Sequence, residues 1–308
     1  MPPPSRPTAF WALLLLLTFG CDHSTQFLLR GRTVKSRQSP PWMVTLHKER
    51  ETIFNCAGTL LSSRVVHTAA HCISGVSSSN RMQMTINDYK ADVPELDREI
   101  VRKGSDFFRA KDHYEFWEKR DDYGLLFFKE NVSVCDRKDP HTLSVPLILS
   151  PDIFPNITTP QSMEKGKCMV TGWGLDEFGH YEHRLHMATT KHVLVYNDAL
   201  AVQKYKKHAS ACNGDSGSPL ICNVNGMPIL LGNVAGGIAQ QSMESKEKDW
   251  ERCEKRLDIY SYIYRQLPCI KRELENRKLW DDFVETQHRC AEYYTAKRGV
   301  DWQSLFDL

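Results

Sequence analysis

Short apolar runs separated by Gly, Ser, Asn and Pro fill most of the chain, from residue 42 to about residue 237. The clearest of these runs are residues 42–46, 65–68, 125–128, 169–171 and 229–234. Short apolar runs between turn-forming residues are typical of β-strands, and a chain of many short strands folds as a sandwich or a barrel. The pattern therefore predicts an all-β domain.

After Tyr264 the pattern changes to a helical one. Apolar residues recur at helical intervals among Glu, Lys and Arg, namely at Ile270, Leu274, Phe283 and Val284. One or two helices are therefore expected to end the chain. The stretch before them, residues 240–256, has few apolar residues, so we expect an exposed inserted loop there.

The charges are balanced. The 308 residues include 40 Lys and Arg against 38 Asp and Glu, a formal net charge of +2, with no tract of like charges. Nucleic acid and acidic membranes are therefore not expected as partners. Since 41% of the residues are hydrophobic and 25% are charged, the chain can bury a core, which excludes a disordered or fibrous protein.

The N-terminus carries an apolar stretch at residues 9–19, which follows Arg6 and ends before the small Gly20. This arrangement is typical of a secretory signal peptide over residues 1–20, and its apolar core is too short to span a bilayer comfortably. No later run of the sequence is long enough for a membrane anchor. We therefore expect a secreted, extracellular protein.

The ten cysteines are an even set, and in an oxidising compartment such a set indicates disulfides. The sequence has no CxxC pair and no HExxH motif, so neither a metal nor another cofactor is expected. Asn131 and Asn156 begin the sequons Asn-Val-Ser and Asn-Ile-Thr, which are candidate glycosylation sites on an extracellular surface.

Three segments offer the groups that nucleophilic acyl transfer needs: a hydroxyl, a base, a carboxylate that orients the base, and donors for the oxyanion. In the first, His71 stands beside Cys72, a cysteine that Cys56 could bind, and such a bond would fix the histidine backbone. In the second, Asp121 and Asp122 precede an apolar strand. The base and its carboxylate are therefore both available.

The third segment is the turn Asn213-Gly214-Asp215-Ser216-Gly217. A tight turn flanked by glycines exposes the Ser216 hydroxyl. It also directs the N–H groups of Gly214 and Ser216 to one point, where the oxygen of a tetrahedral intermediate could sit. Each segment alone is weak evidence, but the order His, Asp, Ser forms a catalytic constellation.

The residues around these segments form four motifs: Ala57-Gly58-Thr59-Leu60, Thr68-Ala-Ala-His71-Cys72, Cys168-Met-Val-Thr-Gly172-Trp173-Gly174 and Gly214-Asp-Ser-Gly-Ser-Pro219-Leu220. They resemble those of the chymotrypsin/trypsin family of secreted serine proteases, over about residues 41–270. The resemblance implies two packed six-stranded antiparallel barrels with a site in the cleft between them. Residues 33–277 would form this domain, residues 21–32 a propeptide, and residues 278–308 a C-terminal helical extension.

The resemblance also implies roles for the residues. His71 would be the general base and acid, Asp122 would orient it, and Ser216 would be the nucleophile. Asp121 competes with Asp122, but the segment Asp122-Tyr-Gly-Leu-Leu matches the family's Asp-Ile-Ala-Leu-Leu in register. Disulfides would join Cys56 to Cys72 and Cys168 to Cys222.

In this family the residue six before the nucleophile lies at the floor of the primary specificity pocket, and here it is Ser210. Taken alone, this serine favours an aromatic or large apolar substrate side chain. Asp258, however, stands where a glycine normally lines the same pocket, and Gly237 lies in the strand that binds substrate backbone. A carboxylate at this place would bind Arg or Lys, and burial requires a water or a cation against it. The alternative is that Asp258 is an ordinary surface acid.

Family zymogens are activated by a cut whose new ammonium pairs with the Asp beside the nucleophile, here Asp215. No clean copy of the family's new N-terminus exists in this sequence. One candidate end is Leu28-Leu29-Arg30-Gly31, although Phe27 and not a basic residue precedes it. The alternatives are a cut after Arg30 and a cut after Arg32 that leaves Thr33-Val34. If none of these ends reaches Asp215, the oxyanion turn stays unformed and the enzyme is weak. Two further residues depart from the family's Ser-Trp-Gly strand, which binds substrate backbone. Ala235 lacks the serine hydroxyl near the triad carboxylate, and Gly236 lacks the aromatic wall.

The remaining cysteines admit several pairings. Cys253 is well placed to pair with Cys212 around the insertion. Cys21 with Cys135 would tether a cut propeptide, and Cys269 with Cys290 would clip the C-terminal extension. The aromatic residues of that extension either pack on the barrel or bind a partner.

The sequence thus predicts a secreted serine endopeptidase, made as a zymogen and cleaving proteins or peptides after Arg or Lys. An activating protease and protein inhibitors would be its other partners. The alternative is a protease-like secreted binding protein with an idle triad, which Ala235, Gly236 and the unusual N-terminus favour. The complete set of candidate catalytic groups favours the enzyme.

Overall fold

The computed structural model describes residues 28, 31–48, 56–76, 82–91, 93–94, 98–110, 121–156, 167–176, 178–181, 183–190, 192–196, 199–204, 209–239, 248–254, 256–296 and 306. The signal peptide expected at residues 1–20 lies outside the described residues. Of the expected propeptide, only Leu28, Gly31 and Arg32 are described.

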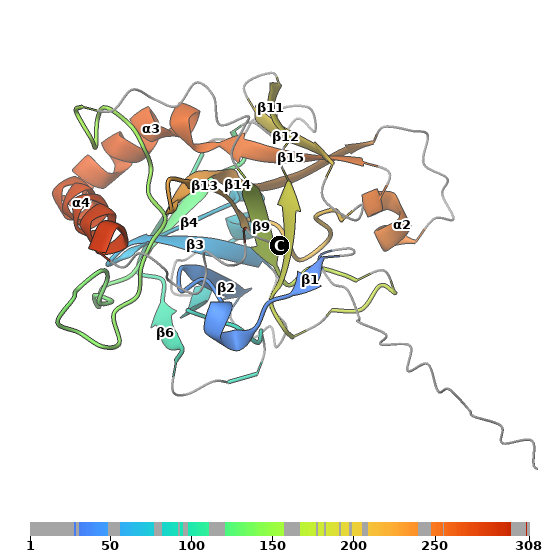
Figure 1. The fold of residues 1–308 in the computed structure, drawn as a ribbon, viewed down its shortest axis with the longest axis horizontal. Helices are drawn as coiled ribbons and strands as arrows, with labels where there is room; N and C mark the ends of the chain where they lie inside the picture. Colours follow the sequence, from blue (N-terminus) through green and yellow to red (C-terminus); the bar gives the residue numbers. More distant parts are fainter. Residues whose placement is uncertain are drawn as a thin grey trace, which may run out of the picture.

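Two antiparallel sheets make up the body of the molecule (Figure 1). The first has the order β6-β5-β2-β3-β4-β8-β7. Its strands are β2 (Met43–Lys48), β3 (Cys56–Ser62), β4 (Val65–Thr68), β5 (Met82–Ile86), β6 (Ile100–Lys103), β7 (Asp106–Arg109) and β8 (Gly124–Phe127). Every residue of β3, β4 and β8 is buried, with no alternation of buried and exposed positions, because these strands are covered on both faces.

The second sheet has the order β1-β10-β9-β13-β14-β15-β12-β11. Its strands are β1 (Arg32–Thr33), β9 (Cys168–Gly172), β10 (His186–Thr190), β11 (His192–Tyr196), β12 (Ala199–Lys204), β13 (Pro219–Val224), β14 (Met227–Ala239) and β15 (Arg256–Tyr262). The five apolar runs identified in the sequence coincide with strands, except that Trp42 and Phe128 lie one residue outside β2 and β8. The prediction of an all-β domain is therefore confirmed.

Each sheet closes on itself through one interrupted strand. β6 and β7 follow each other across two residues, and β6 pairs with β5 while β7 pairs with β8. In the same way β10 pairs with β9, and β11, one residue later, pairs with β12. When each such pair is counted as one bent strand, both sheets have the six strands of the expected barrels, and β1 is added to the edge of the second.

Two helices end the described chain, α3 (Ile263–Asn276) and α4 (Trp280–Ala296), as the helical periodicity predicts. They lie side by side at one end of the molecule (Figure 1). Ile270 and Leu274 on α3 and Phe283 on α4 are buried in the main core, because each helix packs its apolar face on the body of the molecule. Among the described residues no helix is long and apolar enough to cross a membrane.

The expectation of a loop over residues 240–256 is wrong in its second half. The segment contains the helix α2 (Asp249–Glu254), and Cys253 within it is buried in a disulfide with Cys212. The disulfide supplies the burial that the polar sequence does not predict. Arg256 already belongs to β15.

Four disulfides join cysteines of the described chain: Cys56–Cys72, Cys135–Cys290, Cys168–Cys222 and Cys212–Cys253. The pairings of Cys21 with Cys135 and of Cys269 with Cys290 are therefore wrong. Cys269 is a free thiol on α3, and Cys21 lies outside the described residues. Sequence spacing could not reveal the bond from Cys135 to Cys290, because it spans 155 residues.

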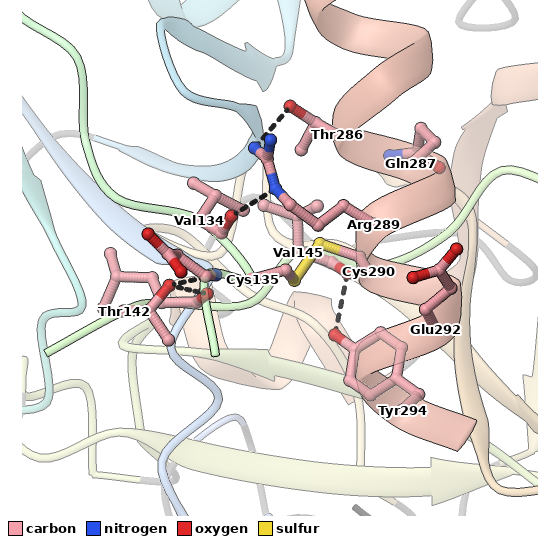
Figure 2. The surroundings of a disulfide bond; sticks show 12 residues. Val134, Cys135, Thr142, Val145, Thr286, Gln287, Arg289, Cys290, Glu292 and Tyr294 are labelled. Atoms are coloured by element: carbon pink, nitrogen blue, oxygen red, sulfur yellow. Dashed lines mark hydrogen bonds between the residues drawn. A yellow bond between two sulfur atoms is a disulfide. The ribbon is translucent and has the colours of Figure 1, made fainter. Parts of the chain in front are cut away.

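Figure 2 shows how this bond attaches α4 to the body. Beside it, Arg289 Nε donates to the Val134 carbonyl over 3.0 Å, and the buried Tyr294 hydroxyl donates to the Val145 carbonyl over 2.7 Å. One turn earlier, the buried Gln287 accepts from the Ile148 N–H at 2.8 Å. The aromatic side chains of α4 therefore pack on the barrel, as one of the two readings of the C-terminal extension predicts.

We expect loss of this disulfide to destabilise the whole domain. The Cys135→Ser/Cys290→Ser double variant should lower the free energy of unfolding by about 2 to 5 kcal/mol, because a cross-link that closes a long loop restricts the unfolded chain. Denaturant unfolding of the purified chain measures the change. Cys269→Ser is the matched control, since it removes a thiol without a cross-link. An equal effect of the two changes would contradict the assignment.

Candidate active site

Adjacent strands bring His71 and Asp122 together. β4 pairs with β8 in the register Thr68↔Gly124, and His71 follows β4 in the 3-10 helix η2 (Ala70–Ile73), while Asp122 precedes β8. His71 Nδ1 lies 2.6 Å from Asp122 Oδ2, and the His71 backbone N–H donates to Oδ1 over 2.9 Å. Asp122 therefore contacts His71 through both carboxylate oxygens. The carboxylate beside His71 is thus that of Asp122, which the register of the segment favours over Asp121.

The main-chain carbonyl of Asp122 is held from the second barrel. Asn233 Nδ2, on β14, donates to it over 3.2 Å, and Ser261 Oγ, on β15, lies 2.9 Å from it. Ser261 Oγ also lies 2.8 Å from Asn233 Oδ1. Both side chains are fully buried. The missing hydroxyl at Ala235 is visible in the sequence, but the role of Asn233 and Ser261 is not, because a polar side chain within a strand does not reveal which distant carbonyl it will meet.

The helix α3 also supports the segment of Asp122, through His67 and Tyr123. Gln266 on α3 is 2.9 Å from His67 Nε2, and the His67 ring stacks on Tyr123, the residue after Asp122. Burial lowers the pKa of His67 to about 4, with the Gln266 hydrogen bond opposing this shift, so His67 is neutral at physiological pH. His67 is thus a structural histidine, whereas His71 is partly exposed to solvent.

The turn that carries Ser216 requires its glycines. Gly214 has a φ of +97° and Gly217 a φ of +81°, a region that other residues rarely adopt. A Cβ at Gly217 would also lie 2.2 Å from the carbonyl oxygen of Ala57. The Ser216 side chain stays partly exposed while its neighbours Asp215 and Gly217 are buried. The local sequence therefore presents a hydroxyl on a rigid turn.

Backbone contacts join this turn to the segment of His71. The Ala57 N–H donates to the Ser216 carbonyl over 2.8 Å, and the Thr68 hydroxyl donates to the Ala57 carbonyl over 2.7 Å. Cys56, the residue before Ala57, is bonded to Cys72, the residue after His71. Two different barrels thus place the imidazole and the serine in one region of the molecule.

The carboxylate of Asp215 lies fully buried beneath the turn. Its Oδ1 accepts from the Gly174 N–H at 2.8 Å and its Oδ2 from the Cys212 N–H at 2.9 Å. Burial raises the pKa of Asp215 to about 7, with a smaller rise from Asp258, and the two N–H donors and Arg256 oppose it. In the uncut chain, backbone donors therefore hold the carboxylate that the resemblance assigns to a new ammonium.

This carboxylate also explains the glycines of the motif Gly172-Trp173-Gly174. A Cβ at Gly172 would lie 2.1 Å from Asp215 Oδ1, and a Cβ at Gly174 would lie 2.2 Å from Oδ2. A Cβ essentially never approaches another atom this closely, so a side chain at either position would force the buried acid to move. The motif is thus a backbone cradle for one buried acid.

The candidate pocket residues Ser210, Asp258 and Gly237 lie together. Ser210 Oγ is 3.0 Å from Asp258 Oδ1 and 2.9 Å from the Cys253 carbonyl, and the Ala211 N–H donates to Asp258 Oδ2 over 2.8 Å. Gly237 pairs with Asp258 between β14 and β15. Because Asp258 is only 1% exposed, the reading of it as a surface acid is wrong.

The described part of the N-terminal segment packs on the second barrel. Leu28 is buried in the core, and β1 pairs Arg32 with Met187 and Thr33 with His186. A cut after Arg32 would therefore separate the two residues of an ordered strand. Arg30, the other candidate for a cut after a basic residue, lies outside the described residues.

Cys56, His71 and Cys72 place three ligand-type atoms within 4.8 Å of one another. Both sulfur atoms belong to the Cys56–Cys72 disulfide, and a disulfide sulfur is not a thiolate ligand. The cluster is therefore part of the His71 support and not a metal centre.

Comparison with known proteins agrees with this arrangement. The sequence profile of the family described as Trypsin matches residues 29–248. Limulus clotting factor C of Carcinoscorpius rotundicauda is 26% identical over 221 residues, which are 63% of this chain and 21% of that protein. Tissue-type plasminogen activator of Mus musculus is 24% identical over 245 residues, 69% of this chain and 41% of that protein. The chain thus spans less than half the length of these curated relatives.

The buried acid should make stability depend on pH. Because the pKa of Asp215 is raised in the folded state, its contribution is complete below about pH 4 and is lost as the pH rises to about 7. Relative to Asp215→Asn, the uncut chain should lose about 3 kcal/mol of unfolding free energy between pH 4.5 and 7.5. Urea unfolding at both pH values measures this, with Asp152→Asn as an exposed-acid control. Parallel pH profiles of wild type and Asp215→Asn would rule out the raised pKa.

Proposed function

Because the chain belongs to the trypsin family of serine proteases, we propose that it is a secreted serine endopeptidase whose triad is His71, Asp122 and Ser216. The observation that carries this proposal is the contact of His71 with Asp122 through both carboxylate oxygens. In this contact Asp122 holds the imidazole by Nδ1, which leaves Nε2 free to exchange a proton with a hydroxyl.

The chemistry would proceed in two steps. His71 Nε2 takes the proton of Ser216 as its oxygen bonds to the carbonyl carbon of the peptide, and the imidazolium then protonates the leaving amine. The resulting acyl-enzyme is hydrolysed by a water that His71 activates in the same way. The N–H groups of Gly214 and Ser216 would stabilise the negative oxygen in both steps.

Activation is proposed to follow the zymogen scheme. A new N-terminal ammonium, from an end near Leu28 or from a cut after Arg30 or Arg32, would pair with Asp215 and replace hydrogen bonds by a charge pair. An opposite charge next to a buried carboxyl group favours its ionised form. Proteins or peptides would be the substrates, and an activating protease and protein inhibitors would be further partners.

Secretion fits the four disulfides of the described chain, since disulfides persist in oxidising compartments. Asn131 and Asn156 are both exposed, so an oligosaccharide could attach to either without disturbing the core. The extracellular location and the glycosylation of these two asparagines are proposed on this basis.

Covalent labelling tests the triad. We expect a fluorophosphonate to label the processed protein, and we expect Ser216→Ala to abolish both labelling and hydrolysis, the latter by on the order of a millionfold. Ser74→Ala is the control, because Ser74 is exposed near His71 but belongs to no proposed catalytic group. Absence of labelling in correctly processed protein would favour the alternative of an idle binding protein.

The pocket is proposed to select Arg or Lys through Asp258. Matched amide substrates with Arg, Lys or Phe at the cleaved position should show higher kcat/KM for the basic residues. Asp258→Gly should reduce this preference about tenfold to a hundredfold, because a charge-assisted hydrogen bond is lost, and should leave the Phe substrate little changed. A preference for Phe that survives Asp258→Gly would reject the assignment.

A further inference from the structure

Arg256 stands on the same strand as the pocket carboxylate. It begins β15, two residues before Asp258, so the two side chains leave the same face of the strand. In the pairing with β14, Asp258 lies opposite Gly237 and Arg256 opposite Ala239. Arg256 is therefore next to the pocket, on the side of α2.

The Arg256 side chain takes the place that a side chain of Gly237 would occupy. A Cβ built on Gly237 would lie 2.2 Å from Arg256 Cδ, 2.6 Å from Nε and 2.7 Å from Cγ. Beyond this point the guanidinium donates to the carbonyl of Ala211 over 3.0 Å. The side chain thus runs from β15 across Gly237 to the segment of Ser210.

Arg256 and Asp258 bind the two ends of one residue. Asp258 Oδ2 accepts the N–H of Ala211, and Arg256 donates to the carbonyl of the same residue. Arg256 therefore places a positive charge on the same backbone segment that the buried Asp258 binds. Asp215, the second buried acid, also feels the charge of Arg256, which opposes the rise of its pKa.

We propose that Arg256 occupies the primary specificity pocket of this protein as an internal competitor for the basic side chain of a substrate. This inference rests on the proposed protease function, which assigns the pocket to Ser210, Asp258 and Gly237. A substrate Arg or Lys must displace Arg256 before it can reach Asp258. The apparent affinity for basic substrates is then reduced by the fraction of molecules whose pocket is filled.

The Arg256 side chain does not satisfy all its hydrogen-bond donors in this position, so a substrate can displace it from the pocket. Among the residues that the structure describes, the buried Nε of Arg256 has no hydrogen-bond partner. A buried donor without a partner weakens the filled state. A substrate guanidinium that satisfies all its donors in the pocket binds there more favourably than Arg256 does.

Removal of the Arg256 side chain tests the proposal. Arg256→Ala should raise kcat/KM for Arg and Lys amides by about tenfold or more, through a lower KM, because no internal competitor remains. Lys248→Ala is the matched control, since it removes one exposed positive charge from the same insertion and should change nothing. Arg256→Gln, which keeps a side chain over Gly237 without the charge, should give a smaller increase and covers the case that the alanine variant folds poorly.

Binding of benzamidine separates the pocket from the chemistry. In a Ser216→Ala background, Arg256→Ala should bind benzamidine about tenfold more tightly, and adding Asp258→Asn should cancel the gain. Equal benzamidine affinity with and without Arg256 would overturn the inference. A preference for Asp substrates that disappears in Arg256→Ala would also overturn it, because Arg256 would then bind substrates and not compete with them.

Fluorophosphonate labelling distinguishes the two possible failures. Equal labelling rates in wild type and Arg256→Ala, with no gain for basic substrates, reject the pocket inference and leave the triad intact. No labelling in either protein rejects the proposed function, while benzamidine binding still decides whether Arg256 fills the pocket.

Discussion

The buried carboxylate of Asp215 is the constraint on which the candidate site depends. It can lie below the turn only because the N–H groups of Gly174 and Cys212 bind both of its oxygens. The same position forces glycine at residues 172 and 174, since any Cβ there would collide with the acid. With the acid in place, the turn above it leaves Ser216 partly exposed directly after a buried residue.

The remaining groups are held by contacts between distant parts of the chain. His71 and Asp122 meet through neighbouring strands of the first barrel, and the second barrel holds the Asp122 carbonyl through Asn233 and Ser261. The helix α3 adds Gln266 below, against His67. The Cys135–Cys290 bond in turn fastens α4, so the C-terminal helices belong to the scaffold of the site. A site built this way is rigid because several elements fix each group.

Several features could be predicted from the residues and others could not. The strands and the C-terminal helices follow from hydrophobic periodicity, which is a local property. The pairing of Cys135 with Cys290 was missed because it joins segments 155 residues apart. The helix α2 was missed because its burial comes from the Cys212–Cys253 bond and not from apolar residues of its own. Asn233 and Arg256 belong to no motif, and the strand motif around Asp258 includes Ser261 without indicating that it contacts the Asp122 carbonyl.

The sequence by itself determined the all-β fold class, the motifs of a serine protease and the identity of the candidate catalytic groups. Motifs and periodicity are properties of neighbouring residues. Only the tertiary structure decided which carboxylate contacts His71, what supports Asp122 and Asp215, and that Arg256 lies across the candidate pocket. Those outcomes depend on contacts between residues far apart in the chain, and such contacts exist only after the two barrels have closed and packed.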